Sequence, residues 1–252
     1  GGPAASTNDV TPTIVGSGVG AAGETVVVTL ALPGTTDDVI RTALVQDDGT
    51  WNVTPILSEG DWSITAEVTD EAGNTGSSTQ TLTVDLVRPN VLIEPGDTDA
   101  TNSFSPWIVG STDIAVGQTV EVTFTLPDDA GDLVVESSAF VQDNLSWGVV
   151  EDLSDGVWRV LAEVTDEAGN TGSFTQFLTV DTTAPVVSIV DVGVTNDPRP
   201  EITFATEAGA TVTAVIVGVV VGVTRDSTDN TAWSATPVED LGDGVYTVTV
   251  TA

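Results

Sequence analysis

The side chains best able to do chemistry in this chain are the carboxylates and amides of a repeated loop. The decapeptide Val-Thr-Asp-Glu-Ala-Gly-Asn-Thr-Gly-Ser occurs unchanged at Val68–Ser77 and Val164–Ser173. Each copy carries an Asp and an Asn four residues apart, Asp70 with Asn74 and Asp166 with Asn170. Such oxygens are the ligands that Ca²⁺ takes, about six to eight at a time. They also hydrogen-bond the backbone of tight turns, where the intervening Gly permits positive φ. The loop therefore predicts a turn, with a metal role in addition.

The composition argues against most other chemistry. The chain has 252 residues without Cys, His, Met or Lys, and five Arg stand against 38 acidic residues for a formal charge of −33. No thiol or imidazole is present for the common zinc, nucleophilic or general-base sites, so an enzyme is the least expected class. Phosphates would be repelled, so we expect no nucleic-acid partner, whereas cations are favoured. The longest apolar run, AVIVGVVVGV at residues 214–223, is too short to span a bilayer, so no membrane insertion is expected.

The two decapeptides belong to a longer internal repeat. Both copies continue into a segment that ends Leu-Thr-Val-Asp, at Asp85 and Asp181, and the displacement from Asp70 to Asp166 is the same 96 residues. A constant displacement indicates a repeat architecture. Other landmarks extend the alignment to three copies: Asn8, Asn102 and Asn196; Trp51, Trp147 and Trp233; Trp62, Trp158 and Tyr246. The expected repeats are residues 1–85, 86–181 and 182–252.

The periodicity within each repeat is that of β-strands. Trp62, Ile64, Ala66 and Val68 alternate with polar residues, a pattern of period two that predicts a half-buried strand. In the second repeat we predict seven strands, at Asn90–Glu94, Pro106–Gly110, Thr119–Leu126, Leu133–Val141, Trp147–Val150, Gly156–Thr165 and Thr175–Val180. Seven short strands in about 100 residues are typical of an immunoglobulin-like sandwich. Two aromatic residues per repeat, from the fifth and sixth strands, are expected between the sheets.

Short linkers join the repeats. Asp85-Leu-Val-Arg-Pro-Asn and Asp181-Thr-Thr-Ala-Pro-Val each run directly into the next first strand. Pro89 and Pro185 hold the preceding residue extended, which makes the joints stiff. The expected fold is therefore all-β, with three tandem immunoglobulin-like β-sandwiches arranged end to end as a rod.

The linker pattern Asp-x-x-x-Pro and the motif Val-Thr-Asp-x-Ala-Gly-Asn resemble the bacterial Ig-like tandem repeats of large biofilm-associated and RTX-type surface adhesins. The resemblance covers essentially the whole chain. It implies extender modules that hold a terminal binding region away from the cell, with calcium stiffening the interdomain joints. It also implies an extracellular, cell-surface location.

The sandwich topology predicts where the oxygen donors meet. The last hairpin of one repeat should lie at the end where the chain enters, beside the linker and the first loop of the preceding repeat. At the first joint this set is Asn8, Asp9, Asp85, Asp166 and Asn170. At the second joint it is Asp99, Asn102 and Asp181, with Asp97 within reach. Asp70 and Asn74 would face a repeat upstream of this chain.

The pattern leaves the outer repeats incomplete. No residues equivalent to Asn90–Glu94 stand in the first repeat, and the third repeat lacks the last hairpin and strand. Open sandwiches invite strand addition. Either the sequence is a fragment of a longer tandem array, or a filament subunit is completed by strand exchange. The fragment is favoured because Gly1–Thr7 has no alternating apolar residues for a donor strand.

The expected function is that of a structural extender segment in an extracellular adhesin or surface fibre. Its partners would be neighbouring repeats of the same chain or identical subunits. One alternative is the self-assembling filament subunit. The other is a module that binds glycan or protein through Trp107, which is expected to point outward because its counterparts are Thr13 and Glu201, or through the loop Pro127–Asp132.

Overall fold

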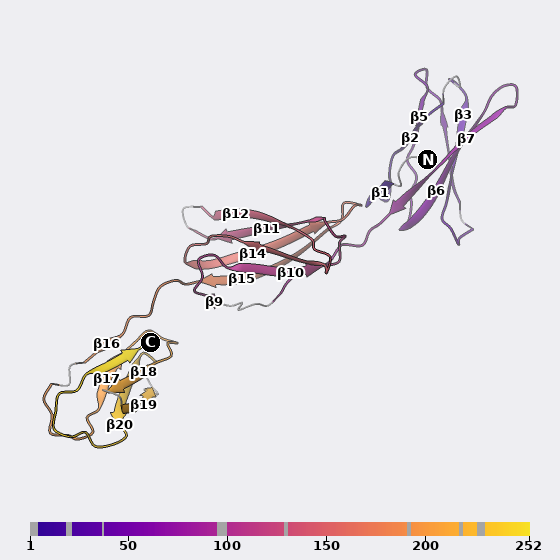
Figure 1. Cartoon of the computed structure of the whole chain (residues 1–252). Helices are drawn as coiled ribbons and strands as arrows, with labels where there is room; N and C mark the ends of the chain where they lie inside the picture. The colour runs from indigo at the N-terminus through magenta and orange to yellow at the C-terminus, as the bar shows by residue number, and fades with distance from the viewer. Residues whose placement is uncertain are drawn as a thin grey trace. The chain divides into compact units, whose positions relative to one another are not determined.

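The fold consists of β-strands connected by turns and loops. The computed structural model describes residues 5–18, 22–36, 38–94, 100–128, 131–190, 193–216, 219–225 and 230–252. These residues form 21 strands, and no helix occurs among them (Figure 1). None of the described residues therefore belongs to a helix that could cross a membrane. The chain divides into two compact units, Gly1–Asp181 and Thr182–Ala252.

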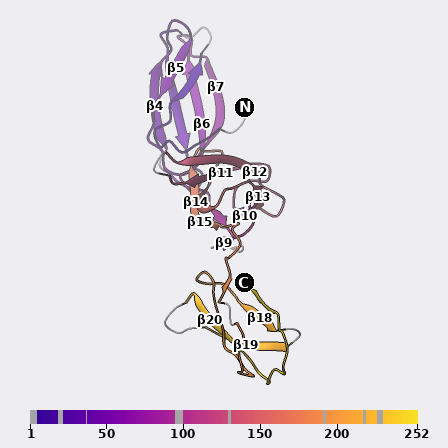
Figure 2. The ribbon, with the colours of Figure 1, turned by 90° about the vertical axis from the view of Figure 1, so that its left-hand side faces the viewer.

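The first repeat is a sandwich of two sheets. Its larger sheet has the order β1-β7-β6-β3-β4, with strands β1 (Ala5–Thr7), β7 (Thr75–Val84), β6 (Gly60–Thr69), β3 (Thr25–Ala31) and β4 (Val39–Leu44). In Figure 2, β4 and β7 accordingly lie on opposite sides of β6. Its smaller sheet consists, within the described residues, of β2 (Ile14–Ser17) and β5 (Thr50–Val53).

The second repeat has the same larger sheet and a wider smaller one. The larger sheet has the order β12-β11-β14-β15-β9, with strands β12 (Leu133–Phe140), β11 (Thr119–Leu126), β14 (Gly156–Thr165), β15 (Thr171–Val180) and β9 (Ala100–Thr101). The smaller sheet has the order β13-β10-β8, with strands β13 (Ser146–Val150), β10 (Trp107–Thr112) and β8 (Val91–Ile93). Strand β8 is the element that the described part of the first repeat does not match.

All seven strands predicted for the second repeat are confirmed, and two details differ. Strand β15 begins at Thr171, four residues earlier than predicted, because the hairpin ladder runs up to the turn and pairs Thr165 with Thr171. The hydroxyl oxygens of these two Thr residues lie 3.2 Å apart. The short strand β9 was not predicted, because two residues are too few to give an alternating pattern. It pairs in parallel with Thr179 and Val180 of β15.

Tryptophan residues fill the space between the sheets in the first two repeats, as predicted. Trp51, Trp62, Trp147 and Trp158 are all buried. The indole Nε1 of Trp62 donates to the Ser58 carbonyl, and that of Trp158 donates to the Ser154 carbonyl, both at 2.9 Å. These bonds satisfy the one polar atom of each ring, as a buried indole requires.

The third repeat departs from the prediction of two buried aromatic residues. Its described residues form six strands in one sheet, in the order β16-β17-β20-β19-β18-β21, with strands β16 (Ser188–Ile189), β17 (Ile202–Ala205), β20 (Ala232–Pro237), β19 (Val219–Arg225), β18 (Thr213–Ile216) and β21 (Val248–Thr251). Trp233 is half-buried and Tyr246 is 39% exposed. Tyr246 precedes β21, and no strand like β15 covers it within the described residues. Its hydroxyl donates to the Gly242 carbonyl four residues back, the spacing that Trp62 and Trp158 use.

Candidate functional site

Both copies of the decapeptide fold into the same turn. In the first copy Asp70 accepts the Asn74 backbone N–H on Oδ1 at 2.8 Å and the Asn74 side-chain N–H on Oδ2 at 2.9 Å. In the second copy Asp166 accepts the same two groups of Asn170 at 2.9 and 3.0 Å. The Gly that follows Ala72 or Ala168 has a φ of 88° or 93°. The predicted turn role of these residues is therefore confirmed.

The two identical turns differ in burial. Every residue from Thr69 to Thr81 is exposed in the first repeat. In the second repeat Ala168 is 8% exposed and Asn170 is 7% exposed. Because the ten residues are the same, the difference comes from what packs against them.

Three contacts cover the turn of the second repeat. The Asn170 side-chain nitrogen donates to the backbone carbonyl of Asp85 in the linker, at 2.9 Å. The backbone N–H of Asn8, in the first loop of the first repeat, donates to the Ala168 carbonyl at 2.9 Å. The Pro89 carbonyl lies so close to Gly172 that an added Cβ would be 1.8 Å from its oxygen. The loop, the linker and the hairpin that the topology places at the first joint thus do meet.

Carboxylates at the first joint bind mainly their own neighbours in the chain. Asp9 Oδ1 accepts the backbone N–H and the hydroxyl of Thr11, at 2.7 and 2.9 Å. Asp85 Oδ1 accepts the backbone N–H of Val87 at 2.9 Å, so it is the Asp85 carbonyl that reaches the hairpin. These bonds fix the loop and the linker.

The structure says less about a metal role for the other oxygen donors predicted from the sequence. Asp97 and Asp99 lie outside the described residues. Asn102 is exposed, and the Asp181 backbone N–H donates to the Thr101 carbonyl at 2.9 Å. Asp70 and Asn74 are exposed in their turn. A metal role for any of these residues stays a prediction.

A hollow of about 460 Å³ at the first joint brings further acids together. It is lined by Asp85, Asp113, Asp166, Glu167 and the single cation Arg88, among other residues. Sequence reasoning missed Asp113, because its counterpart in the first repeat is Val19 and so no repeated acid marks the position. Asp113 Oδ1 accepts the Asn90 backbone N–H at 2.7 Å.

The acidic side chains that line this hollow are of the type that binds a hard cation, but they are few. Its ionic donors are oxygens alone, which Ca²⁺ prefers. Within the described ranges, no three residues of the Asp, Glu, His and Cys types are grouped closely enough to hold a metal ion. An ion here would therefore rely on one or two carboxylates together with carbonyls, amides and water.

The turn carboxylates keep their charge to low pH. Burial raises the pKa of Asp166, but hydrogen bonds from the Asn170 side chain and from the Asn170, Ala168 and Gly169 backbone lower it more, so the net pKa lies below its usual value. The pKa of Asp70 is lowered chiefly by the Asn74 side chain and backbone. Both turns therefore hold an ionised carboxylate at neutral pH.

Trp107 forms a separate surface feature. It is 73% exposed, which confirms the predicted outward orientation. A Cβ added at Gly148 would lie 2.7 Å from its Nε1, so the ring crosses the Gly148 backbone. A hollow of about 210 Å³ beside it is lined by Glu94, Ser103, Ser105 and Gln176, among other residues.

The family model for the bacterial Ig-like domain matches residues 4–86, 95–182 and 190–252. The chain belongs to the bacterial Ig-like domain family. Its three matched segments cover most of the sequence, and they include both decapeptides. No curated protein matches this bacterial Ig-like chain.

Several solved structures are similar to the chain over most of its length. A tetra-tandem repeat from the extending region of a large adhesion protein is 23% identical, covers 97% of this chain and 68% of its own, and has a TM-score of 0.34. A 1.5-MDa bacterial ice-binding adhesin is 23% identical over 90% of this chain and 79% of its own, with a TM-score of 0.35. A marsupial T cell receptor is 9% identical over 98% and 93%, with a TM-score of 0.46. All three scores are below 0.5, so the family assignment rests on the family model.

Proposed function

We propose that this chain is a structural extender segment of an extracellular adhesin or surface fibre, without a catalytic role. The observation that carries the proposal is the different burial of one decapeptide. At Val68–Ser77 it is exposed, and at Val164–Ser173 the linker and the preceding repeat pack on it through Asn170 and Ala168. A turn that keeps its own hydrogen bonds and also offers a docking face is suited to joining copies in series.

The partners in this proposal are neighbouring repeats of the same chain. Each joint would add length at the cost of few residues, because the linker from Asp85 to Pro89 enters the next repeat directly. The charge of −33 fits an exterior location, where ions screen the repulsion between like charges.

Calcium is the proposed stiffening ion of the joint. Asp85 and Asp166 would supply its carboxylates, and the carbonyls and amides around Asn8 and Asn170 could complete the set. A bound Ca²⁺ would neutralise charge where Asp113 and Glu167 also gather. The oxygen-only donors and the large negative charge support this proposal.

Calcium titration with calorimetry tests the metal part. Ca²⁺ should raise the melting temperature of the unit Gly1–Asp181, by the equivalent of about 2.7 kcal/mol at a hundredfold excess over Kd, and chelation should reverse the shift. Asp85→Asn should remove most of the shift, whereas Asp132→Asn, in the loop before β12, should not. Equal shifts in both variants would indicate general screening, and no shift at all would sink the calcium site while leaving the joint contacts untouched.

Small-angle scattering tests the extender role itself. If the joint between the first two repeats is stiff, the maximum dimension of the chain should stay constant between low and moderate salt. In Gly172→Ala, which places a Cβ against the Pro89 carbonyl, the distribution of dimensions should broaden. A wild-type chain as broadly distributed as this variant would argue against a stiff extender.

A second candidate function is adhesion through Trp107. An exposed aromatic ring beside a hollow lined by Glu94, Ser103 and Gln176 has the elements of a carbohydrate site, since sugars stack on rings and bond to polar groups. Binding on a glycan array that is lost in Trp107→Ala and kept in Phe177→Ala, another exposed aromatic residue, would favour it. Absence of any glycan signal in the wild-type chain would remove this candidate.

A further inference from the structure

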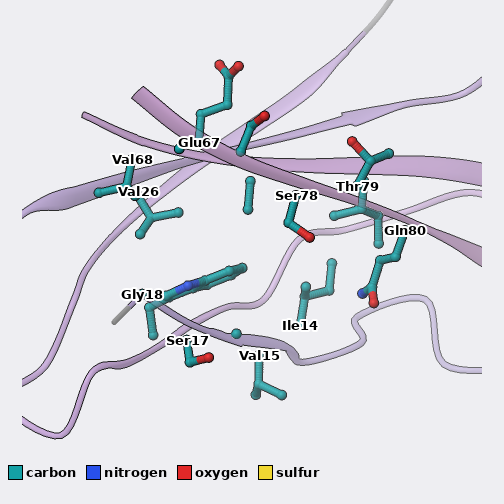
Figure 3. Close-up of a pocket in the computed structure, with 16 residues that line it drawn as sticks. Ile14, Val15, Ser17, Gly18, Val26, Glu67, Val68, Ser78, Thr79 and Gln80 are labelled. Carbon is teal, nitrogen blue, oxygen red and sulfur yellow. The ribbon is translucent and has the colours of Figure 1, made fainter. Parts of the chain in front are cut away.

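The larger sheet of the second repeat has an outer face that differs from the same face of the first repeat. Strands β12, β11, β14 and β15 are neighbours in this sheet (Figure 1). The side chains that alternate with the buried ones form its outer face. In the first repeat Glu67 and Thr79 lie on this face, and Figure 3 shows both projecting away from Ile14 of the facing sheet. Equivalent positions of the two faces can therefore be compared.

Five outward positions change in character between the two repeats. Three become aliphatic, one becomes aromatic and one becomes cationic. The residues of the second repeat are Val134, Val157, Arg159, Leu161 and Phe177, and their counterparts 96 residues earlier are Asp38, Asp61, Ser63, Thr65 and Thr81. Both repeats form the same larger sheet, so the fold does not require these apolar side chains. Exposed apolar groups that gather on one face indicate a contact surface.

Arg159 lies in the middle of this surface. The strand register places Arg159 beside Thr125 of β11 and beside Phe177 of β15, and Thr125 pairs in turn with Val134 of β12. Arg159 is exposed, and no ion pair joins it to another described residue. Arginine is enriched in protein interfaces because its planar cation pairs with carboxylates. The surface therefore offers a cation to an acid that comes from outside it.

Acidic side chains lie further along the same face. Glu163 comes four residues after Arg159 on β14, and it pairs with Glu121 of β11. At about 3.3 Å per residue, Arg159 and Glu163 are roughly 13 Å apart, with Leu161 midway between them. The face thus carries a cation on one side of Leu161 and acids on the other. Such an arrangement is complementary to itself, because a second copy turned end to end places its acids over the cation.

We propose that this face binds the same face of a second copy of the chain, as an antiparallel pair. The two-fold axis would run across the strands at Leu161, so that the two Leu161 side chains meet. Arg159 of each copy would lie opposite Glu163 of the other copy and next to its Glu121. Packed sheets are about 10 Å apart, a gap that an Arg and a Glu side chain can span together. The proposal does not depend on calcium or on the extender role.

The size of the face limits the strength of the pair. Its four strands, about 4.8 Å apart and about nine residues long, cover roughly 600 Å², so two copies would bury about 1,200 Å². This area is at the lower end for specific interfaces. Glu136 lies in the same row as Leu161 and would face Glu136 of the other copy, which adds repulsion. We therefore expect a Kd of about 0.1 mM or weaker, and a monomer below about 10 µM.

Sedimentation over a concentration series tests for the pair. In about 0.15 M NaCl the sedimentation coefficient of the full chain should rise between about 10 µM and about 1 mM. In about 0.02 M NaCl the rise should move to higher concentration, because two chains of charge −33 repel each other. Glu136→Gln should move it to lower concentration. A monomer at every concentration would overturn the proposal, and a rise that Glu136→Gln does not move would contradict the proposed register.

Exchange of the two charges tests which residues face each other. Arg159→Glu and Glu163→Arg should each associate with themselves at least about tenfold more weakly, because each puts like charges opposite one another. An equimolar mixture of the two variants should associate as the wild-type chain does, since each supplies the charges that the other needs. Glu67→Arg, the same change at the equivalent position of the first repeat, should have no effect. A mixture that stays monomeric, or equal weakening by Glu67→Arg, would overturn the proposed contact.

Cross-linking locates the axis. The chain has no Cys, so an introduced Cys reports on one position alone. A short bis-maleimide should join Leu161→Cys to its own copy, whereas Thr65→Cys, at the equivalent position of the first repeat, should give only the yield of random collisions. Phe177→Thr, which restores the residue type of the first repeat, should weaken association at least about threefold with little change in melting temperature. Equal cross-linking of the two Cys variants, or full association of Phe177→Thr, would contradict the proposal.

Discussion

The side-chain amide of Asn170 links a local turn to an interdomain contact. Its nitrogen donates to Asp166 Oδ2 at 3.0 Å and to the Asp85 carbonyl at 2.9 Å. Asn74 makes the equivalent bond to Asp70 while exposed to solvent. The chain thus contains its own control, since the same residue in the same decapeptide is packed against a described neighbour at Asn170 and is exposed at Asn74.

Replacing these two residues by Ala should separate the contributions. Asn170→Ala removes the turn bond and also the side-chain donor of the carbonyl of Asp85, a half-buried residue, which should cost about 1–3 kcal/mol. Asn74→Ala removes only the exposed turn bond. Its destabilisation should be smaller than that of Asn170→Ala by about 1 kcal/mol or more. Calorimetry of the full-length variants measures the difference. Equal destabilisation would mean that the bond to Asp85 contributes nothing to stability.

The pKa of each turn carboxyl should respond to its Asn partner. A carboxyl whose folded pKa is lowered adds stability above its unfolded pKa of about 3.9, and that stability is lost as pH falls through the folded pKa. Both turns should therefore stay intact at pH 5 and loosen below about pH 4. Carboxyl-carbon NMR should find the pKa of Asp166 raised in Asn170→Ala and that of Asp70 raised in Asn74→Ala. A pKa that stays low in the variants would assign the effect to the backbone donors alone.

At the scale of elements, strand β8 accounts for the main difference between the first two repeats. It closes the smaller sheet, buries Val164, and brings the Pro89 carbonyl onto Gly172 at the start of β15. The same position in the first repeat, Gly76 on β7, has open space around it. Gly172 therefore allows the close approach of the Pro89 carbonyl, whereas Gly76, in the same decapeptide, faces no such contact.

Alanine at these two glycines should have opposite effects. Gly172→Ala forces a Cβ against backbone that cannot move without disturbing β8, at a cost of about 1–3 kcal/mol. Gly76→Ala meets no atom closer than 4.0 Å and should be neutral or stabilising by up to about 1 kcal/mol, because Gly weakens a strand. Thermal unfolding of the two variants gives the comparison. Similar destabilisation of both would show that strand geometry matters here and not the Pro89 contact.

Element positions were predictable because alternation and turn residues are local signals. The seven strands of the second repeat and the turn at Asp166 follow from them. The bond from Asn170 to Asp85 spans 85 residues, and only the assumed sandwich topology anticipated that the two residues would meet. Asp113 and strand β9 were not predicted from the sequence. Asp113 has no acidic counterpart in the first repeat, and the two residues of β9 are too few to form an alternating pattern. In the third repeat, the alignment of Tyr246 with Trp62 and Trp158 predicted a buried ring, but Tyr246 is 39% exposed, because no strand of the described residues lies beside it as β15 lies beside Trp158.

At the scale of the whole molecule, the large negative charge is the property that most affects stability. A formal charge of −33 on 252 residues repels itself in dilute buffer. The ion pair of Arg199 with Asp240, at 2.6 Å, joins two exposed side chains and adds little stability. The apolar cores of the described residues therefore contribute more to stability than this ion pair, and screening should help the folded chain.

Raising NaCl from about 0.02 to 0.5 M should increase the melting temperature of both units, because the Debye length falls from roughly 20 Å to below about 5 Å. The rise should level off once neighbouring charges are screened. Calorimetry at fixed pH measures it, with a neutral osmolyte as the control. A melting temperature that falls with salt would contradict a stability limited by charge repulsion.

Hydrogen exchange of the two decapeptides tests the central claim, that the last hairpin of a repeat is a docking face for the repeat before it. Because the ten residues are identical, their intrinsic exchange rates are equal, and any difference reports the surroundings. Mass spectrometry can tell the copies apart in peptides that extend to Ser78 or to Phe174. We predict slower exchange at Val164–Ser173 than at Val68–Ser77, and loss of most of that difference in Asn170→Ala. Equal exchange of the two copies in the wild-type chain would contradict the account.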